Sequence, residues 1–190
     1  DFLRQNQTSS PPHLVIGNPA GDADSITSAL CWAYVKSSSA IPILSITRHD
    51  LTTQRPETML LLQWAAVPID LLMDIDDTSR FTKATVTLVD HNRLTLPQQD
   101  WTVTEILDHH LDQGYHVDTC PLRDIAFAED RATVASTTTL VVERATLPLP
   151  SDVALLLLGT ILLDSVNMSP AAGKGTPRDQ AAIEALLTQT

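Results

Sequence analysis

One stretch decides how this chain folds and where its chemistry lies: Leu107-Asp108-His109-His110, at the end of the apolar run 103–107. Neighbouring side chains on a strand point to opposite faces. A strand that ends and bends here can turn Asp108, His109 and His110 toward one pocket. A carboxylate with two imidazoles indicates a metal site or acid–base chemistry. The alternative is a surface loop with two solvated histidines.

A second Asp-His pair follows another predicted strand. Residues 84–89 are rich in β-branched side chains, which favour a strand, and the strand ends at Asp90-His91. Open α/β sheets bind their ligands at the carboxyl ends of the strands. We therefore expect Asp90 to lie beside His109 and His110.

Two further acids stand between a predicted strand and a predicted helix. Residues 14–17 predict a short buried strand, and a turn at 18–21 leads to Asp22 and Asp24. A helix follows, with Asp24 or Ser25 expected as its N-cap. Two carboxylates at the start of a helix would repel a bare phosphate. Their presence is explained if a divalent cation binds between the acids and the phosphate. Simple capping with one solvated acid is the alternative.

Strands and helices alternate along the rest of the chain. The alternation predicts an α/β fold with a mostly parallel sheet flanked by helices. We expect one domain over 13–190, preceded by a flexible lead-in at 1–12. The remaining predicted elements are strands at 41–46 and 102–107, helices at 58–67, 133–144, 152–163 and 177–187, irregular chain at 113–129 with a short strand at 115–117, and a solvated acidic loop at Asp74, Asp76 and Asp77.

Composition excludes several classes of function. The chain has 190 residues and a net charge of −11, which argues against nucleic acid or an anionic membrane as a partner. Cys31 and Cys120 lie far apart and are expected to be buried and reduced, in keeping with a cytoplasmic location. The longest apolar stretch, 153–163, is too short to span a bilayer.

A further acid, Asp164, closes the predicted apolar helix 152–163. Burying a carboxylate without a partner costs several kcal/mol, so we expect a cation beside Asp164. The alternative is a helix that ends at the surface, with a solvated acid.

Carboxylate oxygens combined with imidazoles are ligands that suit Mn²⁺, Mg²⁺ or Co²⁺, whereas a zinc site is typically richer in thiolates. Four carboxylates exceed the needs of one octahedral ion, and two ions roughly 3.5–4 Å apart would use them all. The predicted chemistry is hydrolysis of a phosphoester or phosphoanhydride. The candidate residues are Asp22, Asp24, Asp90, His109, His110 and Asp164.

These motifs, in this order, resemble those of the DHH phosphoesterase superfamily. The sequence is similar to its exopolyphosphatase and prune-type branch, and more distantly to family II inorganic pyrophosphatases. The similarity runs from about residue 14 to about residue 187 and includes the segment from Gly173-Lys174 to Asp179. The four motifs are Gly17-Asn18 through Asp22 to Asp24-Ser25, then Val89-Asp90-His91-Asn92, Asp108-His109-His110, and Leu162-Leu163-Asp164.

The resemblance implies a role for each metal-binding residue. Asp90 would bridge two divalent cations. Asp24, His109 and Asp164 would complete one metal site, and Asp22 would serve the other.

The resemblance also implies which residues act on the substrate. His110 would be a hydrogen-bond donor or general acid, and Asp90 and Asn18 are the other predicted catalytic residues. Amide oxygen is a weaker ligand than imidazole, so Asn18 would hold substrate or a weaker metal site. The predicted substrate contacts are His110, Asn18, His91, Arg48, Arg55 and Lys174. For each of the two arginines, the alternative is an ordinary surface salt bridge.

The activity that the resemblance implies is that of an exopolyphosphatase, releasing orthophosphate from the ends of polyphosphate. Asn18 stands where the pyrophosphatases carry a metal-binding histidine, and animal prune-type proteins tend to carry arginine at the position of His110. Three alternatives stay open: a prune-like phosphodiesterase or short-chain polyphosphatase, an inorganic pyrophosphatase, and a metal-binding interaction module with little turnover. The family also implies a covalently linked carboxyl-terminal domain that closes over the site with basic residues.

Overall fold

The computed structural model describes residues 11–36, 40–96 and 100–189, so residues 1–10 of the predicted lead-in lie outside the described residues. Six strands form a parallel sheet in the order β3-β2-β1-β4-β5-β6, and β7 and β8 form a separate antiparallel pair. The predicted α/β fold with a mostly parallel sheet is confirmed. The strands are β1 (His13–Ile16), β2 (Ala40–Leu44), β3 (Met73–Asp74), β4 (Lys83–Val89), β5 (Asp100–Asp108), β6 (Leu122–Ile125), β7 (Phe127–Ala128) and β8 (Arg131–Ala132).

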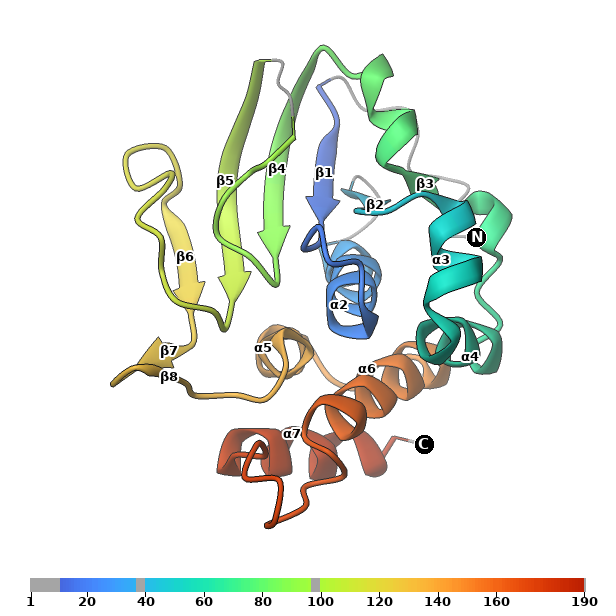
Figure 1. Cartoon of the computed structure of the whole chain (residues 1–190), viewed down its shortest axis with the longest axis vertical. Coiled ribbons are helices and arrows are strands. Elements are labelled where there is room, and N and C mark those ends of the chain that lie inside the picture. The colour runs from blue at the N-terminus through green and yellow to red at the C-terminus, as the bar shows by residue number, and fades with distance from the viewer. Residues whose placement is uncertain (1–10, 37–39, 97–99, 190) are drawn as a thin grey trace.

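The helices lie in two layers beside this sheet. Contacts with the strands come mainly from α2 and α5, and α6 packs against both of these helices and against α4 and α7. Figure 1 shows β1, β4, β5 and β6 pointing toward the end of the molecule where α5, α6 and α7 gather. The helices are α2 (Ala23–Val35), α3 (Arg48–Gln54), α4 (Pro56–Trp64), α5 (Thr137–Arg144), α6 (Ser151–Asp164) and α7 (Pro177–Leu187), with short 3-10 turns η1 (Ile69–Leu71) and η2 (Ile75–Arg80).

Both faces of the sheet are covered, which explains why the strands are apolar with little alternation. Val15 in β1 packs into the core on the helix side, whereas its neighbours Leu14 and Ile16 pack into a second core on the opposite face. All three are at most 2% exposed. The two cores fix the register of β1 at the centre of the sheet, because a slip of one residue would exchange the two faces.

The strand order creates a site at the carboxyl end of β1. The chain leaves β1 toward β2 and β3 on one side, and it returns to place β4 on the other side. Ligands bind in open α/β sheets at such a change of direction. The loop after β1 and the residue after β4 therefore come together, as the positions of Asp22, Asp24 and Asp90 predict.

Two features near the start of the chain differ from the sequence analysis. Asp22 is the N-cap of α2, and its side chain accepts a hydrogen bond from the Ser25 amide. The predicted N-cap at Asp24 or Ser25 is therefore wrong, because α2 already begins at Ala23. The second difference is α3, a helix that the sequence did not predict. Thr47 caps this helix, because its side chain accepts a hydrogen bond from the Asp50 amide.

The acidic segment at 74–77 is not a solvated loop. Asp74 is 4% exposed and caps η2, with Asp77 completing the capping box. Arg48 reaches both acids, with nitrogen–oxygen distances of 2.8 Å to Asp77 and 3.6 Å to Asp74. A cation from α3 thus balances the carboxylates, whereas the local sequence shows acids alone.

The second half of the chain follows the predictions more closely. The strand predicted at 115–117 is wrong, because these residues form a turn and the edge strand is β6. The helix predicted at 133–144 begins only at Thr137, since 133–135 form a bend and Ser136 is the N-cap. The helices predicted at 152–163 and 177–187 correspond to α6 and α7.

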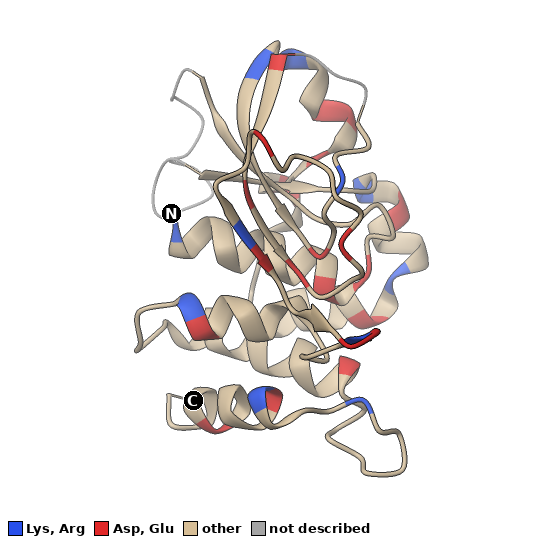
Figure 2. Ribbon diagram, turned by 90° about the vertical axis from the view of Figure 1, so that its left-hand side faces the viewer, with Lys and Arg blue, Asp and Glu red and all other residues tan. Residues whose placement is uncertain are grey.

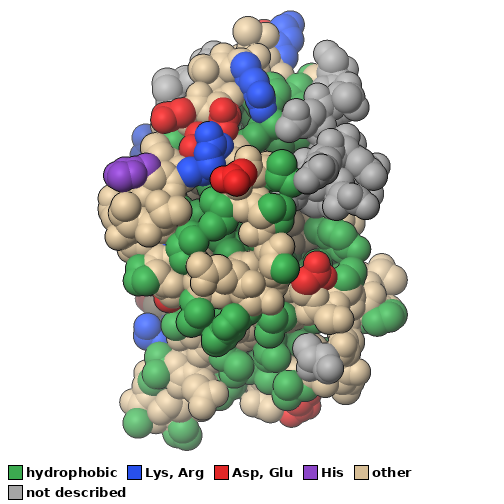
Figure 3. Space-filling model, turned by 90° about the vertical axis from the view of Figure 1, so that its right-hand side faces the viewer, with side chains coloured by type: hydrophobic (Ala, Val, Ile, Leu, Met, Phe, Trp, Pro, Cys, Tyr) green, Lys and Arg blue, Asp and Glu red, His purple; other side chains and the backbone are tan. Residues whose placement is uncertain are grey.

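Figure 2 shows acidic and basic positions interspersed along the chain. Figure 3 shows many hydrophobic side chains on the right-hand side of Figure 1, where α4 lies and exposes Leu60 and Trp64. Cys31 and Cys120 are buried free thiols, as predicted. Within the described ranges, every helix is too short or too polar to cross a membrane.

Candidate metal centre

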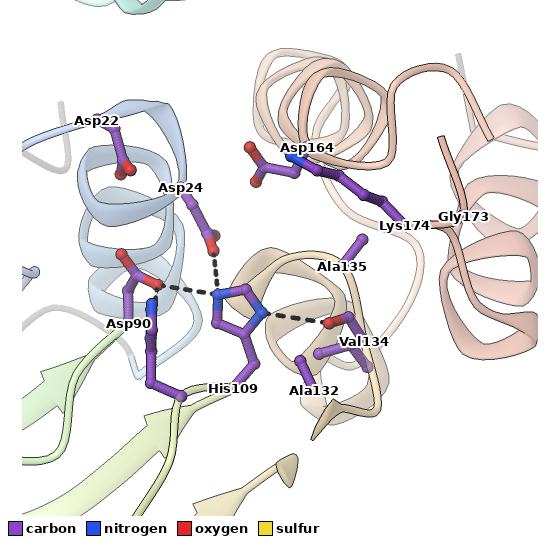
Figure 4. Close-up of a pocket in the computed structure, with 11 residues that line it drawn as sticks. Asp22, Asp24, Asp90, His109, Ala132, Val134, Ala135, Asp164, Gly173 and Lys174 are labelled. Atoms are coloured by element: carbon purple, nitrogen blue, oxygen red, sulfur yellow. Dashed lines mark hydrogen bonds and ion pairs between the residues drawn. The ribbon is translucent and has the colours of Figure 1, made fainter. Parts of the chain in front are cut away.

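A cavity of about 420 Å³ lies where the carboxyl ends of β4 and β5 face α2, α5 and α6. Figure 4 shows Asp24, Asp90 and His109 gathered on one side, with Asp164 and Lys174 reaching in from the other. All six candidate residues therefore meet in one place, although they come from distant segments of the sequence. The lining residues are Asp22, Asp24, Asp90, His109, His110, Ala132, Val134, Ala135, Asp164, Gly173 and Lys174.

A close backbone approach shapes the loop that carries Asp22. A Cβ on Gly17 would lie 2.3 Å from the Ser25 hydroxyl oxygen, so glycine is required for β1 to meet the start of α2. The Ser25 hydroxyl instead donates to the Asn18 carbonyl at 2.8 Å. On the outer side, the Arg55 guanidinium donates to the carbonyls of Ala20 and Gly21. The loop is thus held from both sides just before Asp22.

Asp90 lies at the centre of the site in an uncommon backbone conformation. Its φ of +65° is in the left-handed region, which non-glycine residues rarely occupy. Asn18 stabilises this turn, because its side-chain amide donates to the Asp90 carbonyl at 2.9 Å, and the Asp90 amide donates to Leu107. Burial, followed by the charges of Asp24 and Asp22, raises the pKa of Asp90 well above its ordinary value. A buried acid under such repulsion is a favourable cation ligand.

His109 is oriented as a metal-binding histidine would be. Its Nδ1 lies 3.2 Å from the Val134 carbonyl, which can only accept, so Nδ1 carries the proton. The other nitrogen, Nε2, is 3.3 Å from an Asp90 oxygen and 3.5 Å from an Asp24 oxygen. The ring therefore turns Nε2 toward two carboxylates, and a cation could bind between these three groups. The donor atoms of Asp90, His109 and His110 all lie within 4.8 Å of one another.

The start of α5 holds Asp24 in place. One Asp24 oxygen accepts from the Ser136 hydroxyl at 2.7 Å and the Thr138 amide at 3.0 Å, and the other accepts from the Thr137 amide at 2.7 Å. This second oxygen faces His109. Sequence reasoning missed these residues, and the available signal was the Ser-Thr-Thr run, which is typical of an N-cap.

Asp164 completes the site from the end of α6. Its Oδ2 is buried and has no hydrogen-bond partner among the described residues. Burial, together with the charge of Asp24, raises the pKa of Asp164 to about 7. The alternative of a solvated acid does not apply to this oxygen, which is removed from solvent. An unpartnered buried carboxylate oxygen beside imidazole and carboxylate donors fits a divalent cation.

Asp108 has a different place from the one expected for it. The side chain is 0% exposed and does not line the cavity. One oxygen accepts from the amides of His109 and His110 and from the His110 ring nitrogen Nδ1 at 2.8 Å. This hydrogen bond raises the pKa of His110, whose side chain is 51% exposed. Asp108 therefore orients the two histidines and does not converge on the pocket with them.

Of the predicted substrate contacts, the structure brings His110 and Lys174 to the cavity and leaves four outside its lining. Asn18 holds the Asp90 backbone, and its Oδ1 accepts from the Ala20 amide. Arg55 braces the loop before Asp22, and Arg48 is paired with acids on η2. His91 is directed to the carbonyl of Val89, and burial lowers its pKa.

Comparison with known proteins identifies a family and several relatives with similar sequences. Residues 13–161 match the family model "DHH family, N-terminal domain". The chain is 37% identical over 200 residues to mouse exopolyphosphatase PRUNE1 and 34% identical over 197 residues to the human protein. Each alignment covers 95% of this chain but 42% of the relative.

The fold is also similar to a solved structure. A Methanococcus jannaschii protein assigned to the family II inorganic pyrophosphatases superimposes with a TM-score of 0.67 and 24% identity. The superposition covers 93% of this chain and 55% of that one. At this identity the likeness concerns the fold alone.

Proposed function

The chain belongs to the DHH family, and from this premise we propose that it is a metal-dependent hydrolase of phosphoanhydrides, with the ends of polyphosphate as its preferred substrate. The observation that carries the proposal is the convergence of His109, Asp90, Asp24 and Asp164 on one cavity, where a buried Asp164 oxygen finds no hydrogen-bond partner in the part of the chain that the structure describes. The names of the curated relatives support the choice of polyphosphate.

The residues divide between two proposed cation sites. Asp24, His109 and Asp164 would hold one ion, Asp22 would hold the other, and Asp90 would serve both. Mn²⁺ and Mg²⁺ suit this donor set, as does Co²⁺. When bound, two such ions polarise phosphoryl oxygens and activate water for in-line attack.

The protein's own groups then act on the substrate. His110 is half exposed at the cavity, and the hydrogen bond from its ring to Asp108 favours the charged imidazolium. We assign it the task of donating a hydrogen bond to the phosphate that carries developing negative charge. Lys174 lines the opposite side and is a phosphate contact of the same kind. Asn18 acts on the site indirectly, because both ends of its amide are used within the protein.

This chain spans 42% of the length of the mouse and human PRUNE1 proteins. For the whole protein we therefore propose a second domain in addition to this one. Polyphosphate is a dense polyanion and the chain has a net charge of −11. A basic carboxyl-terminal domain that covers the cavity would offset the repulsion. We propose residues 13–190 as the catalytic domain of such a protein in the cytoplasm.

A substrate panel with matched variants tests the proposal. Orthophosphate release is measured from polyphosphate and pyrophosphate, and formation of the nucleoside monophosphate is measured from a cyclic nucleotide, each with Mg²⁺ and Mn²⁺. We expect polyphosphate to be hydrolysed, and Asp90→Asn to lower the rate at least about 100-fold. Asp76→Asn, which removes an exposed acid elsewhere, should leave the rate unchanged.

Two outcomes would contradict the proposal at different levels. Turnover of the cyclic nucleotide alone would replace polyphosphate by a phosphodiester substrate. A chain that binds neither ion by calorimetry and hydrolyses nothing would instead favour an interaction module.

A further inference from the structure

A buried carboxylate outside the cavity joins the parts of the candidate site. Asp179, in the first turn of α7, is 0% exposed. Its two oxygens accept from the Ala135 amide at 3.0 and 2.9 Å, from the Thr139 hydroxyl at 2.6 Å and from the Thr176 amide at 2.8 Å. These donors lie on two segments, the bend and first turn of α5 and the residue that caps α7. A buried charge with this many donors is well stabilised and holds its neighbours firmly.

The bond to Ala135 falls between two residues that touch the proposed ligands. Val134, on one side, offers the carbonyl that fixes the His109 ring. Ser136, on the other side, donates its hydroxyl to Asp24. The position of a single backbone amide therefore determines the orientation of both a histidine and a carboxylate at the cavity.

The bond to Thr176 fixes a second segment. Thr176 caps α7 and forms a capping box with Asp179. It lies two residues after Lys174, and both Gly173 and Lys174 line the cavity. The same carboxylate thus holds the base of the Lys174 loop and the bend before α5.

We propose that Asp179 is a positioning residue for the metal centre, which sets the orientation of His109 and Asp24 and holds Lys174 at the cavity. It does so without lining the cavity itself. The inference deepens the proposed function, since it rests on Asp24 and His109 as cation ligands. Outer residues that orient metal ligands typically change metal affinity 10- to 100-fold when they are removed.

Two measurements on the full chain test this role. The first is the tautomer of the His109 ring in metal-free protein, from its ring ¹⁵N shifts, assigned by their loss in His109→Gln. The second is the affinity for Mn²⁺ by calorimetry. For Asp179→Ala we expect the Nδ1–H tautomer to lose its dominance and the affinity to fall about 10- to 100-fold.

Two variants separate positioning from general destabilisation. Thr139→Val removes a buried hydrogen bond to the same carboxylate but leaves the bonds to Ala135 and Thr176, so both readouts should stay within about twofold of wild type. Asp179→Asn can still accept from both amides and donate to the Thr139 hydroxyl, so it should retain the His109 tautomer and most of the affinity. Should Asp179→Ala not fold, Asp179→Ser takes its place with the same expectations.

The inference is overturned if Asp179→Ala leaves both readouts unchanged. It is also overturned if Thr139→Val causes an equal loss, or if Asp179→Asn loses as much as Asp179→Ala. A wild-type chain that binds no Mn²⁺ would contradict the proposed function, while the His109 spectra would still test the role of Asp179.

Discussion

Replacing Asp164 by asparagine is expected to stabilise the metal-free protein at pH 8 and to weaken its binding of divalent ions. Burial and the charge of Asp24 raise the pKa of Asp164 from 3.8 to about 7. The folded protein therefore holds this proton more tightly than the unfolded chain does. The resulting stabilisation is complete below about pH 4 and is lost as the pH rises through 7.

The size of the effect follows from the same numbers. The difference between 3.8 and about 7 corresponds to at most about 4 kcal/mol at pH 8. Asp164 is partly accessible, so solvent screening reduces the expected gain to about 1–2 kcal/mol. Asparagine has nearly the same shape and carries no charge, so it removes the repulsion without leaving a void. At pH 5 the advantage should shrink by more than half.

Urea unfolding in the presence of a chelator, at pH 5 and pH 8, measures this difference. Comparing the two proteins at each pH cancels the contributions of other groups such as His91. Asp152→Asn, an exposed acid at the other end of α6, is the control and should show no gain. Excess Mn²⁺ should reverse the order of the two proteins. The reasoning fails if Asp164→Asn is no more stable than wild type at pH 8 without metal.

Three further predictions follow from single features. Gly17→Ala should lower the free energy of unfolding by about 1–3 kcal/mol, because the new Cβ would meet the Ser25 side chain at 2.3 Å; urea unfolding with no change would refute the close approach. Val166→Gly should stabilise the chain by about 1 kcal/mol, since this β-branched residue has a φ of +53°, whereas Val117→Gly, at another exposed valine, should not. Lys174→Ala should raise KM for polyphosphate about tenfold with a smaller change in kcat, and steady-state kinetics with an unchanged KM would remove Lys174 from the substrate contacts.

The sequence alone was sufficient to predict the fold class and to gather the residues of the site. Residues 84–89 and 103–107 are apolar enough to predict buried strands, and each is followed by an Asp-His pair. Parallel strands bring such termini to one edge. The convergence of Asp90 and His109 could thus be predicted, because it follows from local patterns that can be read directly from the sequence. Their roles as ligands stay predictions.

Features that depend on distant partners could not be predicted. Asp24 is held by Ser136, which lies 112 positions later. The acidic residues next to Asp74 in the sequence predict a solvated side chain. Its burial is explained by contacts with Arg48, which lies on another helix. Asp108 was expected in the pocket, yet the bend after β5 turns it toward the amides of the histidines that follow. Each case is decided by tertiary hydrogen bonds that leave no periodic trace in the sequence.

The cavity draws its acids and imidazoles from separate segments between residues 22 and 164. An ion that needs all of them can bind only after the sheet and α6 have assembled around it, so its binding energy becomes folding energy. At a thousandfold excess over Kd the native state gains about 4 kcal/mol. When the ion is scarce, the protein would then lose stability as well as activity, and its lifetime would be shorter. The abundance of the protein would therefore depend on the metal supply of the cell.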